Sequence, residues 1–190
     1  MGDYSEKKHV VEATDVVHTM ALINKDLLPR MNTVISKAIS LRKAGQHHHS
    51  RQLLETLLDD PEYAACAHLQ IAWSYDNESK EQLAIPHYKS ALLGKLSDSE
   101  RFDTLFGLAC TYRSLGEYVD ALHYFEQTMN EYPTAEEVQP FYAMCLYNLG
   151  RHKEAVQLLL TLLLSTTNSE SIKEYQKAIS LYSDDLDRTW

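Results

Sequence analysis

The side chains most able to do chemistry in this chain are its histidines and cysteines. The sequence contains nine histidines and three cysteines, and its one histidine cluster is His47-His48-His49. Successive residues of a helix point about 100° apart, so three consecutive histidines bind one ion only where they lie in a loop. The other histidines are isolated and lack the spacing of a zinc motif. We therefore interpret residues 47–49 as a polar turn and expect no metal site and no cofactor.

The sequence also lacks the patterns of an enzyme. It has no Gly-x-Ser-x-Gly elbow and no phosphate-binding glycine-rich loop, and its six glycines fall mainly at predicted helix ends. Cys110 is expected on an inner helix face, but a nucleophile also needs a base and a positioning group, and the pattern supplies neither. We expect no catalytic residue and a protein that is not an enzyme.

Composition narrows the classes of partner. The formal net charge of −9 opposes binding to a nucleic-acid backbone or an anionic membrane surface, because both require a basic face. Residues 1–17 have no apolar block typical of a secretory signal, and the apolar stretch at residues 158–164 is too short to span a bilayer. Cys66, Cys110 and Cys145 are widely spaced, which suits free thiols. These features predict a cytoplasmic protein that binds protein or peptide.

A repeat of helix pairs is expected to position any functional surface. In the clearest copy, a large, a small and an aromatic residue at helical spacing precede a turn, and a small and a large residue follow it. These residues are Leu105, Ala109, Tyr112, Gly116, Ala121 and Phe125. This pattern is typical of tetratricopeptide repeats, in which two antiparallel helices leave an apolar flank that the next pair covers.

The same register recurs along the chain. The small residue of the first helix falls at Ala38, Ala72, Ala109 and Ala143, at intervals of 34, 37 and 34 residues. We expect the three extra residues of the middle interval to lengthen the loop at residues 94–99. Glycines at the ends of the first helices, Gly45, Gly116 and Gly150, are expected to adopt left-handed backbone conformations.

The predicted fold class is an all-α, right-handed αα superhelix of about four helix pairs with a C-terminal capping helix. Residues 1–30 form an N-terminal segment in which a helix is compatible with the apolar spacing. A lone amphipathic helix is expected at residues 171–185. The expected repeats are 31–64, 65–101, 102–135 and 136–166, followed by the capping helix and tail at 167–190.

The chain resembles short bacterial tetratricopeptide-repeat (TPR) proteins of unassigned function. The resemblance rests on Gln70–Asn77, Thr111–Gly116 and Met144–Gly150 with Glu154–Val156, and it covers roughly residues 35–164. It implies the superhelical fold and no particular activity. His47-His48-His49 departs from the aromatic and acidic residues more common at that place in such repeats.

The first helix of each pair lines the concave side of such a superhelix, so the residues of a partner-binding groove can be predicted. An apolar floor edged by polar side chains suits an extended peptide or a short helix of a partner. The predicted groove residues are Trp73, Asp76, Asn77, Phe106, Arg113, Met144, Tyr147 and Asn148.

The sequence leaves alternatives open. Arg113 is predicted either to pair with Asp76 across neighbouring repeats or to bind an acidic group or carbonyl of a partner. Trp73 and Met144 either bind a partner or pack against a terminal segment of the same chain. Two other functions fit the same features: a chaperone-like holder of an unfolded substrate, and a structural protein that self-associates into a homo-oligomer.

Overall fold

The computed structural model describes residues 31–189, and no strand occurs among them. The predicted N-terminal segment at residues 1–30 lies outside the described residues, as does residue 190. A helical run covers 31–43. It is followed by α2 (His47–Glu55), α3 (Ala64–Asp76), α4 (Glu81–Leu92), α5 (Asp98–Ser114), α6 (Tyr118–Glu131), η1 (Glu136–Val138), α7 (Gln139–Asn148), α8 (His152–Thr166), α9 (Glu170–Lys173) and α10 (Gln176–Asp184).

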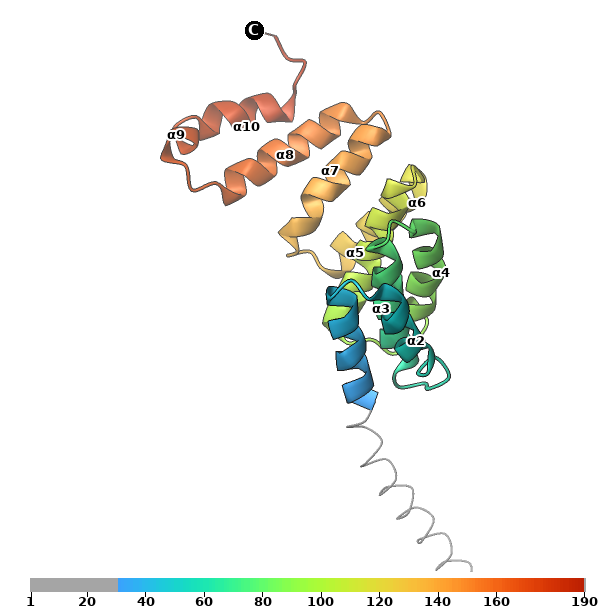
Figure 1. Cartoon of the computed structure of the whole chain (residues 1–190). Helices are drawn as coiled ribbons and strands as arrows, with labels where there is room; N and C mark the ends of the chain where they lie inside the picture. The colour runs from blue at the N-terminus through green and yellow to red at the C-terminus, as the bar shows by residue number, and fades with distance from the viewer. Residues whose placement is uncertain (1–30, 190) are drawn as a thin grey trace, which may run out of the picture.

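The helices pair in chain order, and the pairs stack into a superhelix (Figure 1). Each helix from α2 to α8 contacts the next one along the chain, and α3 also contacts α5 directly. The pairs are 31–43 with α2, α3 with α4, α5 with α6, and α7 with α8, and α10 lies against α8. The structure thereby confirms the prediction of an all-α superhelix of about four helix pairs with a C-terminal cap.

The small residues of the repeat lie where the helices approach most closely. Ala38, Ala72 and Ala109 are completely buried, and Ala143 is 1% exposed. A larger side chain at these positions would force neighbouring helices apart, because protein interiors are close-packed. The predicted register is therefore confirmed in all four repeats.

Left-handed residues end the first helix of each pair. Gly45, Gly116 and Gly150 have φ angles of +76°, +80° and +77°, as predicted from the sequence. In the second repeat the corresponding residue is Ser79, with φ of +55°. A side chain in this conformation is strained, whereas glycine adopts it without a clash between its Cβ and the backbone.

The extra residues of the middle interval lie in a helix rather than a loop. The helix α3 begins eight residues before Ala72, whereas α5 begins eleven residues before Ala109. The loop prediction is therefore wrong, and the extra residues add nearly one turn to the start of α5. Ser97 and Glu100 cap this turn reciprocally, since each side chain bonds the backbone N–H of the other residue.

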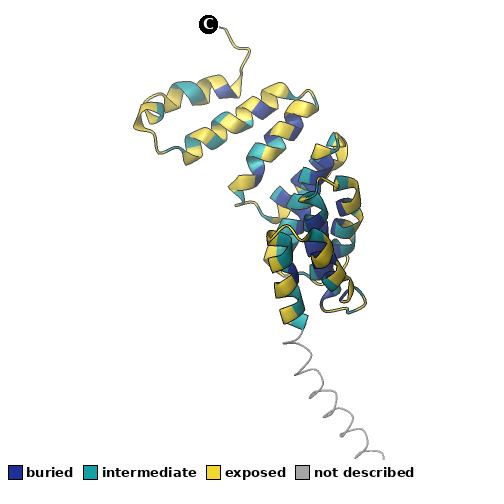
Figure 2. Cartoon of the chain, viewed as in Figure 1, coloured by how far each residue is buried: buried dark blue, intermediate teal, exposed yellow. Residues whose placement is uncertain are grey.

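Burial decreases toward the C-terminal end of the superhelix (Figure 2). The main apolar cluster is built from α3, α4, α5 and α6 together with Val138 and Cys145. In contrast, α8 buries only Ala155. The predicted single helix at residues 171–185 is divided into α9 and α10, with turn residues 174–175 between them.

Candidate partner-binding groove

The repeat interval places equivalent residues of successive first helices in rows along the stack, on the side predicted to be concave. One row contains Ile39, Trp73, Cys110 and Met144, and the next contains Arg42, Asp76, Arg113 and Tyr147. Because α3 contacts α5 directly, the rows are continuous from one helix to the other. From α5 they continue to α7 through Phe106 and Phe141, whose ring centroids are 5.1 Å apart in an edge-on arrangement.

Aromatic and sulfur-containing side chains form the floor of these rows. Trp73 is half-buried, and the Arg42 guanidinium carbon lies 5.1 Å from its ring centroid. Phe106 is half-buried against Phe125, with their ring centroids 6.3 Å apart. Met144 on α7 is 38% exposed. The floor therefore offers apolar area that a partner side chain could cover.

The carboxylate of Asp76 lies at a junction of three helices. It accepts a hydrogen bond of 2.5 Å from the hydroxyl of Tyr88 on α4 and bonds of 3.1 and 3.2 Å from Thr111 on α5. Burial raises the pKa of Asp76, and both hydrogen bonds oppose that rise. No ion pair joins Asp76 to Arg113 in the described part of the chain, so the pairing that was one of the two alternatives for Arg113 is not formed. Tyr88 and Thr111 occupy the carboxylate instead.

Arg113 instead leaves one donor unused. Its side chain is half-buried, and its Nε–H is buried without a hydrogen-bond acceptor among the described residues. Burial raises the pKa of the Cys110 thiol to about 12, and the nearby Arg113 charge opposes this rise. Arg113 exerts the same opposing effect on the pKa of Cys145, which burial also raises.

Arg42 repeats this feature at the equivalent position of the first repeat. Its Nη2 donates to the side-chain oxygen of Gln70 at 3.3 Å, while its Nε–H is buried without an acceptor. Burial lowers the pKa of Arg42. In the sequence, the position of Arg42 in its row gave no sign of this unsatisfied donor.

The remaining predicted groove residues lie at the carboxyl ends of the first helices. Asn77 and Asn148 are exposed; Asn77 directly follows α3, and Asn148 is the last residue of α7. Tyr147 is 61% exposed, with its ring 4.7 Å from that of His152. These side chains form the rim that a bound segment would meet first.

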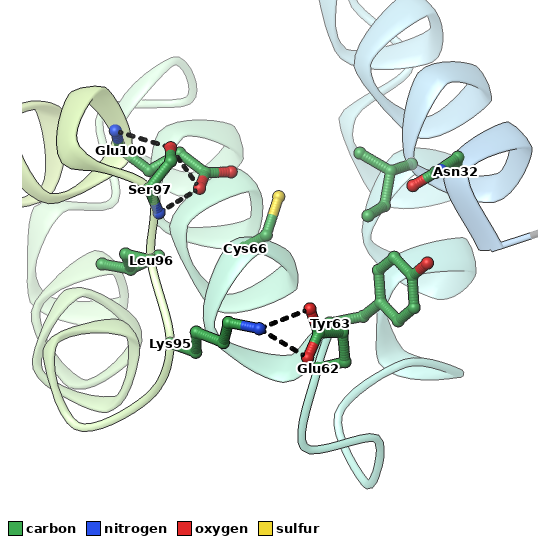
Figure 3. A pocket seen from close by; sticks show the side chains of 9 residues that line it. Asn32, Glu62, Tyr63, Cys66, Lys95, Leu96, Ser97 and Glu100 are labelled. Carbon is green, nitrogen blue, oxygen red and sulfur yellow. Dashed lines mark hydrogen bonds and ion pairs between the residues drawn. The ribbon is translucent and has the colours of Figure 1, made fainter. Parts of the chain in front are cut away.

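A cavity of about 560 Å³ lies where the first three repeats meet, toward the amino ends of their first helices (Figure 3). Lys95 bonds both oxygens of Glu62, at 2.8 and 3.0 Å, across its mouth. Burial and the neighbouring Glu100 carboxylate raise the pKa of the Cys66 thiol to about 12. Glu62, Lys95 and Glu100 were missed in the sequence, although the Ser97-x-x-Glu100 capping signature predicts the local turn. The cavity is lined by Asn32, Ile35, Glu62, Tyr63, Cys66, Lys95, Leu96, Ser97 and Glu100.

The histidine cluster forms the start of a helix. His47, His48 and His49 are the first residues of α2, so the prediction of a turn at this place is wrong. Within residues 31–189, no group of three histidine, cysteine or acidic side chains is arranged to hold a metal ion. None of the helices in this range is sufficiently long and apolar to cross a membrane.

Stacked helix pairs with a concave inner surface define the class of helical-repeat proteins, an architecture of protein-interaction scaffolds. A family model described as Tetratrico peptide repeat matches residues 65–186. The chain belongs to this tetratricopeptide-repeat family. The match leaves out the first helix pair, whose sequence follows the pattern least closely.

Solved structures share the fold at low sequence identity. A crystal structure of MamA protein has a TM-score of 0.61 and 15% identity, with 97% of this chain and 92% of that chain covered. A Podosopora anserina putative kinesin light chain with nearly identical TPR-like repeats has a TM-score of 0.60 and 18% identity, covering 83% of this chain and 88% of that one. A comparison with curated proteins finds no match. These likenesses support the superhelical architecture.

Proposed function

We propose that this scaffold binds a peptide segment or helix of a partner protein in its concave groove and has no catalytic activity. The observation that carries the proposal is the buried Nε–H of Arg113, which has no acceptor in the described chain. Leaving a buried donor unsatisfied costs about 1–3 kcal/mol, so an acceptor on a partner would recover that cost. A backbone carbonyl or a carboxylate would satisfy the donor.

The surroundings of Arg113 fit the same class of ligand. Trp73 and Met144 offer apolar area for partner side chains, while Asn77 and Asn148 offer amides for a partner backbone. The net charge of −9 disfavours nucleic acid and anionic lipid as occupants. A protein is therefore the class of partner that we propose, and a cytoplasmic location, suggested by the widely spaced cysteines, belongs to the same proposal.

Partner capture followed by quantitative binding tests this function. The scaffold would be used to capture proteins from the native organism, and a partner identified by mass spectrometry would be purified for calorimetry. Trp73→Ala and Arg113→Ala should each weaken binding at least about tenfold, or 1.4 kcal/mol. Arg113→Ala should do so with little change in melting temperature, whereas Trp73→Ala also loses packing against the core and is compared at a temperature where it stays folded. Both variants remove contacts that a groove ligand would make.

Arg101→Ala is the matched control. Arg101 lies on the same helix as Arg113, but its guanidinium bonds Glu131 of α6 at 2.6 and 2.9 Å. This exposed pair contributes little to stability, and its removal should leave binding unchanged. Normal binding by Trp73→Ala and Arg113→Ala would exclude the groove and direct attention to the convex side.

A further inference from the structure

The helix α8 is rich in leucine yet poorly covered. Its sequence HKEAVQLLLTLLLST contains one fully buried residue, Ala155. Val156, Leu159 and Leu163 are 44%, 42% and 38% exposed. They recur three and four residues apart, so they share one side of the helix. This apolar stripe is here called the α8 face.

The α6 helix has the same repeat pattern, but its residues equivalent to the α8 face are buried or half-buried. Phe125 of α6 corresponds to Leu159 by the 34-residue interval, and Phe125 is completely buried. The difference follows from the neighbours, since α7 packs against α6 and continues the stack. At the end of the stack, α8 contacts α7 and α10, and α10 itself leaves Leu181 and Tyr182 44% and 52% exposed. The α8 face is thus a stacking surface that the cap covers incompletely (Figure 2).

We propose that the α8 face binds the α8 face of a second copy of this chain around a two-fold axis. In such an interface each residue meets the same surface from its partner, so any charge on the face would oppose an identical charge. Residues 155–169 are the longest uncharged run of the sequence, in a chain of net charge −9. Two copies can therefore meet along α8 without the like-charge repulsion expected over most of their surface.

The size of the face sets the expected affinity. The helix has 15 residues, which gives a length of about 22 Å, and a helix is about 10 Å wide. Even with α10 lying beside α8 (Figure 1), the contact area stays below the roughly 800 Å² per partner of standard interfaces. The dimer is accordingly a reversible one, with a dissociation constant on the order of micromolar.

Sedimentation velocity of the full chain from about 1 to 200 µM tests the proposal across this affinity range. The parent should shift from monomer to dimer, and Leu159→Glu should weaken dimerisation at least about tenfold, because it places two carboxylates opposite each other. Leu83→Glu is the matched control: Leu83 lies on α4 and is 51% exposed, so the same substitution there should leave dimerisation unchanged. Circular dichroism would check that both variants keep the helical signal.

A charge-reversal mixture makes the test specific for this face. Leu159→Lys should also be monomeric alone, and mixing it with Leu159→Glu should restore a dimer, since opposite charges would then face each other. Leu163→Glu provides a second disruption if Leu159→Glu fails to fold. A parent that remains monomeric at 200 µM would overturn the proposal, as would a dimer that persists in the folded Glu variants.

Discussion

The junction around Asp76 gives a prediction whose magnitude follows from its contacts. Tyr88 is 1% exposed, and its hydroxyl donates to the Asp76 carboxylate at 2.5 Å, which joins α4 to α3. A hydrogen bond to a charged group contributes about 1.5–3 kcal/mol. Tyr88→Phe removes the donor and keeps the ring, so we expect a loss of about 2 kcal/mol. For a chain of this length, that corresponds to a fall in melting temperature of about 4–8 °C.

Two further variants separate the charge from the hydrogen bond. Asp76→Asn keeps an acceptor for Tyr88 and removes a charge that burial disfavours. It should therefore lower the free energy of unfolding by less than Tyr88→Phe does. Asp76→Ala leaves the Tyr88 hydroxyl buried without its acceptor and should cost at least as much as Tyr88→Phe. The double variant Asp76→Asn/Tyr88→Phe should lose less than the sum of the single losses, because both changes act on one bond.

The contribution of Asp76 to the free energy of unfolding depends on pH with a definite sign. Burial raises the pKa of Asp76 in the folded protein, so the folded state binds its proton more tightly than the unfolded state does. The contribution of Asp76 to stability is therefore greatest below its unfolded pKa and declines as the pH rises through its folded pKa. Urea unfolding between roughly pH 3.5 and pH 7 should show this decline in the parent and its absence in Asp76→Asn. Tyr88→Phe should raise the folded pKa of Asp76 further above its unfolded pKa, because it removes a hydrogen bond that favours the ionised carboxylate.

Equal stability of Tyr88→Phe and the parent would refute this reasoning. The same conclusion would follow if Asp76→Asn showed the parent's pH dependence after subtraction of the contributions of other groups. Loss of partner binding in Asp76→Asn without any change in stability would instead assign the carboxylate to the groove. These results distinguish a helix junction from a ligand contact at the same residue.

The repeat register makes two further predictions about stability. Ser79→Gly should stabilise the protein by about 1 kcal/mol in urea unfolding, because Ser79 has a left-handed backbone, while Gly116→Ser should destabilise it by a similar amount; changes of the opposite sign would exclude backbone strain as the cause. Ala109→Leu and Ala143→Leu should each cost about 1–3 kcal/mol in thermal melts, because both alanines are buried at close helix contacts. A leucine variant as stable as the parent would contradict the assigned packing.

The sequence predicted the features that repeat and was less successful with those that occur once. Ala38, Ala72, Ala109 and Ala143 could be found because close helix packing demands a small residue at a fixed interval. The extra turn of α5 interrupts that interval, and a longer loop accounts for it equally well when only the spacing is considered. The capping signature from Ser97 to Glu100 was the local signal that favours the helix.

The partners of polar groove residues could not be derived from their rows. Asp76 and Arg113 lie at equivalent positions of neighbouring repeats, which made an ion pair between them a reasonable expectation. The structure instead directs the carboxylate toward the hydroxyls of Tyr88 on α4 and Thr111 on α5. Such choices depend on side-chain rotamers and on a residue of the second helix, neither of which the repeat interval specifies.

The arginines of residues 31–166 separate into two groups by the partners of their side chains. Arg51, Arg101 and Arg151 bond the carboxylates of Glu78, Glu131 and Glu154. Arg42 and Arg113 bond no carboxylate among the described residues, and each buries an Nε–H without an acceptor.

These two arginines share one repeat position, two repeats apart, in a row of the proposed groove. An unsatisfied buried donor weakens a fold. Its occurrence at the same position of two repeats therefore favours a shared cause over two independent packing defects. A ligand that runs along the groove and offers an acceptor to each guanidinium provides such a cause, and Arg42→Ala should then weaken partner binding as Arg113→Ala does.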